Sequence, residues 1–273
     1  LLRPAEAQLG RARSFSGDSA AGESEIAASD RIGDLAMAAG EGHISRSSIL
    51  YGCSEDDCWF DLELFYRDHI QEINQKLNQL DDEIWGKIIM MERNKRVAKA
   101  YLRATTVIVD GGCFGFDGKT IGFNSFDNHS RDEQVEEIKS KIGEGVILKM
   151  DQQGNIIAMA RGCSPVIVQG VRQKDSTCCS EKVTRLKGKL EPAEYGNDQK
   201  DRAVKVFDMK IFKNSIEKEL REPRPNRKNL LFKTCIRISL VKDEPHPLRT
   251  PAWFMIVNLV ALDMLNAKVL LNS

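Results

Sequence analysis

Residues 121–170 constrain the fold more than any other part of the chain, because a helix, a glycine turn and paired strands follow one another closely there. Val135, Ile138 and Ile142 lie on one stripe of a predicted helix. Gly143-Glu144-Gly145 ends that helix, because glycine tolerates a left-handed cap. Strands are predicted over 146–150 and 156–160, joined by a turn over 151–155. The segment therefore predicts a mainly β domain with helices.

Composition excludes several classes of function. The 273-residue chain carries 40 Lys+Arg and 40 Asp+Glu, so it lacks the basic excess expected of a nucleic-acid-binding protein. Its longest apolar stretch, residues 252–262, is too short to span a bilayer, which predicts no membrane partner. The seven cysteines lack regular spacing, which indicates a reducing compartment: the cytoplasm, with the nucleus as a second expectation.

The first part of the chain is predicted to be a disordered tail. Residues 1–56 are rich in Ser, Ala and Gly and poor in aromatic residues. Within this tail, Ser14 and Ser16 follow two arginines, as basophilic kinases prefer, and are candidate phosphorylation sites. The alternative is an ordinary Arg/Ser stretch in a polar tail.

Residues 57–85 are predicted to form an amphipathic helical extension. Its apolar residues recur at a four-three-four-three-four spacing, which defines a continuous seam. The seam consists of Tyr66, Ile70, Ile73, Leu77, Leu80 and Ile84. It could pack against the core of this chain or form a coiled coil with a partner. Its short length favours packing against the core.

The remaining residues, 86–273, are predicted to form one domain of strands and late helices. Residues 171–203 are highly charged and are predicted to be a solvated loop. Strands are predicted over 88–91, 104–109, 204–212, 235–242 and 253–259. Helices are predicted over 216–221, 228–234 and 260–271.

The order of these elements resembles the C-terminal Mad-homology domain of the Smad proteins. The matching sequence segments are Ile121-Gly122, Ile142 to Val146, Val166 to Gln169, Met209 to Asn214 and Cys235 to Lys242. The resemblance covers about residues 88–271 and implies a two-sheet β-sandwich, with a helical bundle at one end and a loop-helix face at the other. The amphipathic helix would be an addition to that fold. The implied function is a protein-interaction module that adapts or scaffolds signalling, without catalysis or cofactor and with a protein partner that remains unknown.

The resemblance also implies a phosphate-binding site. Lys210 and Lys242 match two lysines of the Smad pocket that holds a phosphoserine tail, and Arg249 stands for a basic residue of the adjoining loop. The loop itself departs from the family, because residues 243–248 carry two acids and two prolines where Smads have Gly-Trp-Gly. We therefore expect a degenerate phosphoserine loop. The alternative is a functional phosphoserine-binding, Smad-type transcriptional regulator.

The family's trimer contact is also altered. Smads pair an arginine with an aspartate of a neighbouring subunit, and the matching positions here are about Gly118-Lys119 and Asn266-Ala267. The charge pair is lost, which predicts a monomer. A further likeness, to a Smad-like invertebrate protein, implies a role in epithelial tube (tracheal) morphogenesis.

Two other classes of function are alternatives to an interaction module. Cys178-Cys179 could serve a thiol-dependent enzyme, and the lysines of segment 182–189 could bind nucleic acid. No Cys-x-x-Cys occurs, so a zinc site is not predicted. The four histidines, at positions 43, 69, 129 and 246, suggest no Ser-His-Asp or Cys-His arrangement, and the sequence predicts no enzyme.

Overall fold

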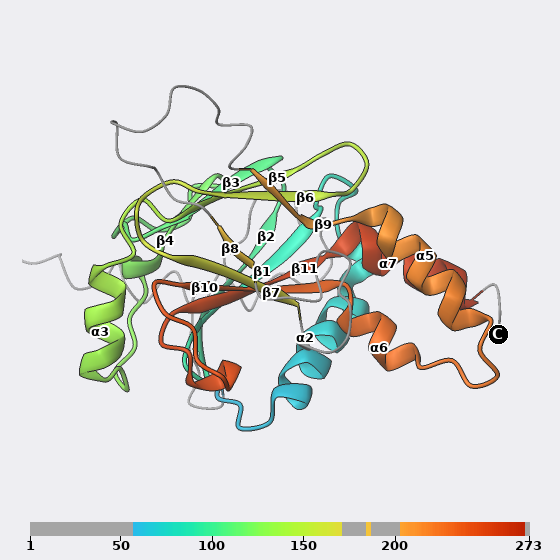
Figure 1. Cartoon of the computed structure of the whole chain (residues 1–273), viewed down its shortest axis with the longest axis horizontal. Coiled ribbons are helices and arrows are strands. Elements are labelled where there is room, and N and C mark those ends of the chain that lie inside the picture. The colour runs from blue at the N-terminus through green and yellow to red at the C-terminus, as the bar shows by residue number, and fades with distance from the viewer. Residues whose placement is uncertain (1–56, 171–183, 187–202, 271–273) are drawn as a thin grey trace, which may run out of the picture. The chain divides into compact units, whose positions relative to one another are not determined.

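The chain is described by a computed structural model over residues 57–170, 184–186 and 203–270. All of these belong to one compact unit, His43–Ser273. Within the described ranges, the strands form two sheets, one of six strands in the order β2-β1-β11-β10-β7-β8 and one of five in the order β4-β3-β5-β6-β9 (Figure 1). The predicted two-sheet sandwich with helices is confirmed.

The six-stranded sheet carries two apolar faces. Its strands are β1 (Gly86–Glu92), β2 (Lys95–Leu102), β7 (Val166–Gly170), β8 (Thr184–Leu186), β10 (Cys235–Leu240) and β11 (Trp253–Asn258). Every residue of β1, β10 and β11 is buried, because one face packs on the other sheet and the opposite face is covered as well. The short strand β8 lies inside the segment predicted to be a loop, so that prediction was wrong there.

The five-stranded sheet closes the other side of the core. Its strands are β3 (Thr106–Asp110), β4 (Thr120–Gly122), β5 (Val146–Met150), β6 (Ile156–Ala160) and β9 (Val204–Phe207). Ile88, Ile238 and Phe254 of the first sheet join Val107 and Leu148 of the second in one apolar cluster between the sheets.

Two of the glycines that carry the family resemblance are required by close backbone contacts. A Cβ at Gly145, which has φ of +63°, would lie 1.9 Å from the carbonyl oxygen of Val109. A Cβ at Gly122 would lie 2.4 Å from the carbonyl oxygen of Gly112. The glycine turn predicted from the sequence therefore lets the end of α3 approach β3 directly.

The helices gather at different places around the sandwich. In chain order they are α2 (Leu62–Lys76), α3 (Glu133–Ser140), α5 (Met209–Leu220), α6 (Arg227–Phe232) and α7 (Leu259–Leu270), with short 3-10 turns η1 (Leu77–Gln79), η2 (Phe123–Ser125) and η3 (Pro247–Arg249). Figure 1 shows α3 at one end of the sheets and α5 and α7 at the other. Among the described residues, no helix is both long enough and apolar enough to cross a membrane.

Two asparagine side chains tie the helical end to the sheets. Asn155, in the turn between β5 and β6, accepts a hydrogen bond from the backbone N–H of Met209 at 2.8 Å. Asn258, at the end of β11, donates to the carbonyl of Gly154 at 3.0 Å and accepts from the backbone N–H of Ala261 at 3.1 Å. The first turns of α5 and α7 are thus positioned by neutral amide groups.

Candidate interaction surface

Helix α2 lies across the outer face of the six-stranded sheet. It begins at Leu62 because the Asp61 carboxylate accepts a hydrogen bond from the Leu64 backbone N–H at 2.7 Å. Of the predicted seam, Tyr66, Ile70 and Ile73 are buried in a second apolar cluster, which also contains Met255 and Val257 of β11. The structure thus places this part of the seam against the chain's own sheet.

The helix is shorter than the predicted extension over residues 57–85. It ends at Lys76, and Leu77 then begins the 3-10 turn η1, after which Leu80 is extended. Leu80 and Ile84 therefore follow the helix instead of continuing its stripe. Both remain partly buried against the same cluster, as does Leu77.

Aromatic rings form much of the contact between α2 and the sheet. Phe65 lies 5.4 Å from Trp253 of β11 and 5.3 Å from Trp59, measured between ring centroids. Tyr66 lies 5.6 Å from Phe232 of α6. Rings at these separations contribute dispersion and quadrupole attraction beyond the area that they bury.

A charged network lies beneath the same helix. The Glu72 carboxylate lies 2.9 Å from Lys87 Nζ and accepts a hydrogen bond from Lys99 Nζ at 2.8 Å. Burial opposes the ionisation of Glu72, but the charge of Lys87 and the hydrogen bonds from both lysines outweigh it and lower the pKa of Glu72 to about 2. Burial lowers the pKa of Lys87 to about 8, and Glu72 offsets part of that effect.

His69 is neutral and structural. Burial lowers its pKa to about 3, against the raising effect of its hydrogen bond to a backbone carbonyl. Nδ1 lies 2.8 Å from the carbonyl oxygen of Phe65, which requires the proton on Nδ1. Nε2 then accepts from Arg96 Nη1 at 3.2 Å. Both ring nitrogens are thus occupied, and His69 has no role as a general base.

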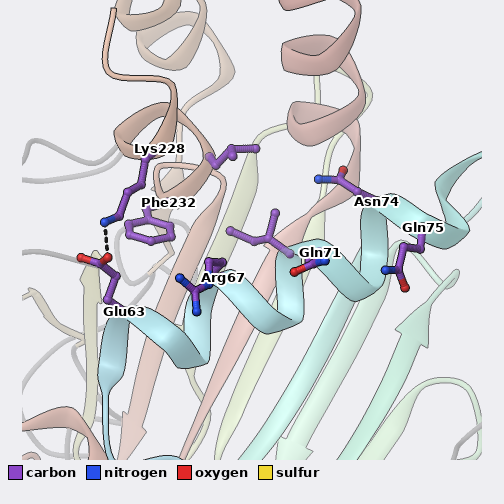
Figure 2. Close-up of a pocket in the computed structure, with 9 residues that line it drawn as sticks. Glu63, Arg67, Gln71, Asn74, Gln75, Lys228 and Phe232 are labelled. Carbon is purple, nitrogen blue, oxygen red and sulfur yellow. Dashed lines mark hydrogen bonds and ion pairs between the residues drawn. The ribbon is translucent and has the colours of Figure 1, made fainter.

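An apolar groove lies between α2 and α6. Its volume is about 550 Å³, and Ile70, Leu231 and Phe232 provide its apolar lining. Arg67, Gln71, Asn74 and Gln75 line it from α2, and Figure 2 shows them in this order along that helix, with Lys228 and Phe232 of α6 above its first turns.

Polar contacts mark the two ends of this groove. At one end Lys228 of α6 forms an ion pair with Glu63 of α2, drawn as a dashed line in Figure 2. At the other end Asn74 accepts a hydrogen bond from Asn266 of α7 at 3.0 Å. The groove is therefore bounded by three helices that are far apart in the sequence.

A second hollow adjoins the first beyond the Glu63–Lys228 ion pair. It measures about 310 Å³ and shares Glu63 and Phe232 with the groove. Phe60, which is 87% exposed, lies on its lining. The hollow thus extends the groove past the start of α2.

The three basic residues predicted to bind phosphate do not form one pocket. The prediction placed Lys210 on a strand over 204–212, but β9 ends at Phe207 and Lys210 lies in the first turn of α5. This turn is held by Asn155 at the helical end, whereas Lys242 follows the opposite end of β10. A six-residue strand spans about 20 Å, so Lys210 is remote from Lys242 and Arg249.

The loop after β10 neutralises its own charges. Lys242 pairs with Glu244 at 2.6 Å. Asp243 accepts hydrogen bonds from Arg237 at 3.0 Å and from Ser239 Oγ at 2.8 Å. Arg249 is exposed, and its backbone carbonyl accepts from Arg93 at 2.9 Å. The two acids that distinguish this loop from the Smad loop therefore hold Lys242, Arg237 and Ser239, whose donors could otherwise serve a phosphate.

Several predicted sites lie outside the described residues. These are the whole tail 1–56 with Ser14 and Ser16, the pair Cys178-Cys179, and Lys182, Lys187 and Lys189. Within the described ranges, no three His, Cys, Asp or Glu side chains are grouped so that they could hold a metal ion.

Comparison with known proteins identifies the class of this domain. The model of the MH2 domain family matches residues 83–259, and the chain belongs to that family, which is the C-terminal Mad-homology domain expected from the sequence. MH2 domains are protein-interaction modules. Helix α2, which supplies one wall of the groove, lies ahead of the matched residues.

Solved structures show weaker similarities. A chain of the crystal structure of STAT2 in complex with IRF9 is 9% identical, with a TM-score of 0.45, over 68% of this chain and 98% of that one. The crystal structure of the interferon regulatory factor 9 IAD domain is 10% identical, with a TM-score of 0.43, over 70% of this chain and 95% of that one. At these values the similarity supports no inference about function.

Proposed function

We propose that this chain is a non-catalytic adaptor or scaffold in signalling, and that it binds a partner protein through the face built by α2 and α6. The observation that carries the proposal is the groove of about 550 Å³ on a domain of the MH2 family. Its apolar lining is set among charged and amide side chains, as in interfaces where an apolar centre has a polar rim.

The proposed biological setting is epithelial tube (tracheal) morphogenesis. It rests on likeness to the invertebrate Smad-like protein Expansion, in which a Smad-type domain carries a helical N-terminal extension and a degenerate receptor loop. The proposed location is the cytoplasm, with the nucleus as a second compartment.

The adaptor is proposed to be a monomer. Asn266, at about the position of the aspartate that Smads use between subunits, donates a hydrogen bond to Asn74 of α2 within this chain. A contact used inside the chain is not available for a neighbouring subunit. We expect light scattering at tens of micromolar to give a mass near 30.7 kDa. A mass near three chains that does not change on dilution would contradict the proposal.

Phosphoserine binding is not part of the proposed function, because Lys210 lies apart from Lys242 and Lys242 pairs with Glu244. Capture of cross-linked partners from epithelial cells by the full chain tests this. We expect specific partners that the double variant Lys210→Ala/Lys242→Ala retains and that phosphatase treatment of the extract does not remove. Partners that are lost both with the double variant and after phosphatase treatment would instead support the phosphoserine-dependent regulator. Recovery of no partner above the bait-free control would refute the adaptor function.

A further inference from the structure

The groove between α2 and α6 has the length of a short helix. It extends along α2 from Glu63 to Gln75, which is about 18 Å at the helical rise per residue, or a little over three turns. An amphipathic helix presents apolar side chains at i, i+4 and i+7 over this length. The volume of about 550 Å³ holds a few side chains of leucine size.

The charge around the groove favours an acidic occupant. Lys228 is already paired with Glu63. The side chain of Arg67 is 64% exposed, and its Nε lies 4.0 Å from the carboxylate of Asp68, its neighbour in sequence, which is a long distance for an ion pair. Arg227, at the start of α6, is exposed as well. An acidic side chain of a partner could approach the exposed guanidinium of Arg67 more closely than Asp68 does and would gain a charged hydrogen-bond donor there.

Amide side chains complete the rim. Gln71 and Gln75 are exposed and lie on the α2 side of the groove with Arg67. Amides offer both donors and acceptors, so they can satisfy polar side chains on the flank of a docked helix. The second hollow, with the exposed Phe60, extends the same surface beyond the ion pair.

We infer that this groove binds an amphipathic α-helix of a partner protein, with an apolar stripe against Ile70, Leu231 and Phe232 and an acidic residue opposite Arg67. The inference rests on the proposed adaptor function and names the chemistry of its partner. The site depends on α2, which lies outside the residues that the MH2 family model matches.

Photocrosslinking of the full chain locates the occupant. Benzoylphenylalanine replaces Gln71 in the groove or, as a matched control, Glu133 on the exposed face of α3. The chain is irradiated in epithelial extract, and the segment attached at Gln71 is identified by mass spectrometry. We expect a partner segment with acidic residues beside an apolar i, i+4, i+7 pattern, absent from the Glu133 sample.

A synthetic peptide of that segment then tests the role of Arg67. We expect Arg67→Glu to weaken binding about tenfold at low salt, and replacement of the facing peptide acid by lysine to restore it. Lys119→Glu, an exposed charge reversal before β4, should leave the affinity unchanged. Circular dichroism should show that the peptide becomes helical when bound.

The outcomes separate this inference from the proposed function. Specific partners that cross-link from other surfaces but not from Gln71 would overturn the helix-binding groove and leave the adaptor function standing. Attachment at Gln71 to this chain itself, to a second copy or to a small molecule would overturn the partner helix. A partner peptide that binds the Arg67→Glu variant as tightly as the parent would overturn the inference that an acidic residue lies opposite Arg67. Absence of any specific partner would overturn both.

Discussion

The two ends of β1 hold two helices in different ways. Near its start, Lys87 faces Glu72 of α2 at 2.9 Å. At its end, Glu92 accepts a hydrogen bond from Lys139 of α3 at 2.7 Å and pairs with Arg131, just ahead of that helix, at 3.0 Å. The strand thus carries a buried positive charge near its start and a buried negative charge at its end. Each charge pairs with a side chain of a different helix.

The difference lies in the apolar contact that accompanies the charges. Helix α2 buries Phe65, Tyr66, Ile70 and Ile73, whereas α3 buries Val135 and Ile138 besides Lys139. Burial of apolar side chains holds α2 on the sheet even when its ion pairs are lost, whereas the packing of α3 depends more on the ion pairs around Glu92. Two helices on one strand should therefore respond differently to the loss of charge.

Removing Glu92 should have the largest effect. Its side chain is 1% exposed and that of Lys139 is 2% exposed, so Glu92→Ala would leave a buried ammonium without its partner. We expect the free energy of unfolding in urea to fall by about 3–5 kcal/mol. Glu136→Ala is the matched control, because Glu136 also pairs with Arg131, at 3.1 Å, but is 67% exposed. Equal losses in the two variants would show that burial does not distinguish these ion pairs.

Truncation beneath α2 should have the next largest effect. Ile73 is fully buried, so Ile73→Ala should cost about 2–5 kcal/mol and lower the melting temperature of the whole domain. Leu77 is partly buried, and Leu77→Ala should cost less, about 1–2 kcal/mol. Asn78→Ala, which is exposed and lies outside the groove lining, serves as the control. If both truncated variants melt like the parent but lose a bound partner, α2 is a separable docking element instead.

Titration of the α2 network should have the smallest effect. Because the pKa of Glu72 is lowered from 4.5 to about 2, its contribution to stability is complete above about pH 4.5 and is lost as the pH falls toward 2. The pKa of Lys87 is lowered from 10.5 to about 8, so stability should rise slightly between these pH values. Urea unfolding across both ranges measures the slopes. The double variant Glu72→Gln/Lys87→Met should flatten them, and unchanged slopes would assign the titration to other groups.

Local patterns predicted most of the sandwich, but the start of α5 shows where pattern reading fails. The apolar residues 204–212 suggested one strand, yet Asp208 caps a helix there by accepting from the backbone N–H of Lys210 at 2.9 Å and of Ile211 at 3.2 Å. Asp208 is a recognisable cap in the sequence. The partner that fixes Met209, Asn155, is distant along the chain and could not be inferred from the segment itself.

The interaction surface was predictable on one side only. The periodic apolar stripe of α2 indicated which of its faces would pack, and the structure buries Tyr66, Ile70 and Ile73 there. The groove uses the edge of the same helix, where Ile70 of the stripe adjoins Arg67 and Gln71, which carry no signal beyond exposure. It forms because α6 lies beside that face, a proximity that no local pattern encodes.

The amide hydrogen bonds at the helical end limit how far acid or added salt can loosen the fold. Asn258 holds the first turn of α7 through bonds to backbone groups without any ionisable side chain, so neither acid nor added salt weakens these bonds directly. The first turn of α5 differs, because the Asp208 carboxylate caps it besides the Asn155 amide. Amide hydrogens of the first turn of α7 should therefore exchange slowly at acidic pH under conditions that already release those around Lys139. The molecule would then loosen at the α3 end first, while the start of α7 keeps its native hydrogen-exchange protection.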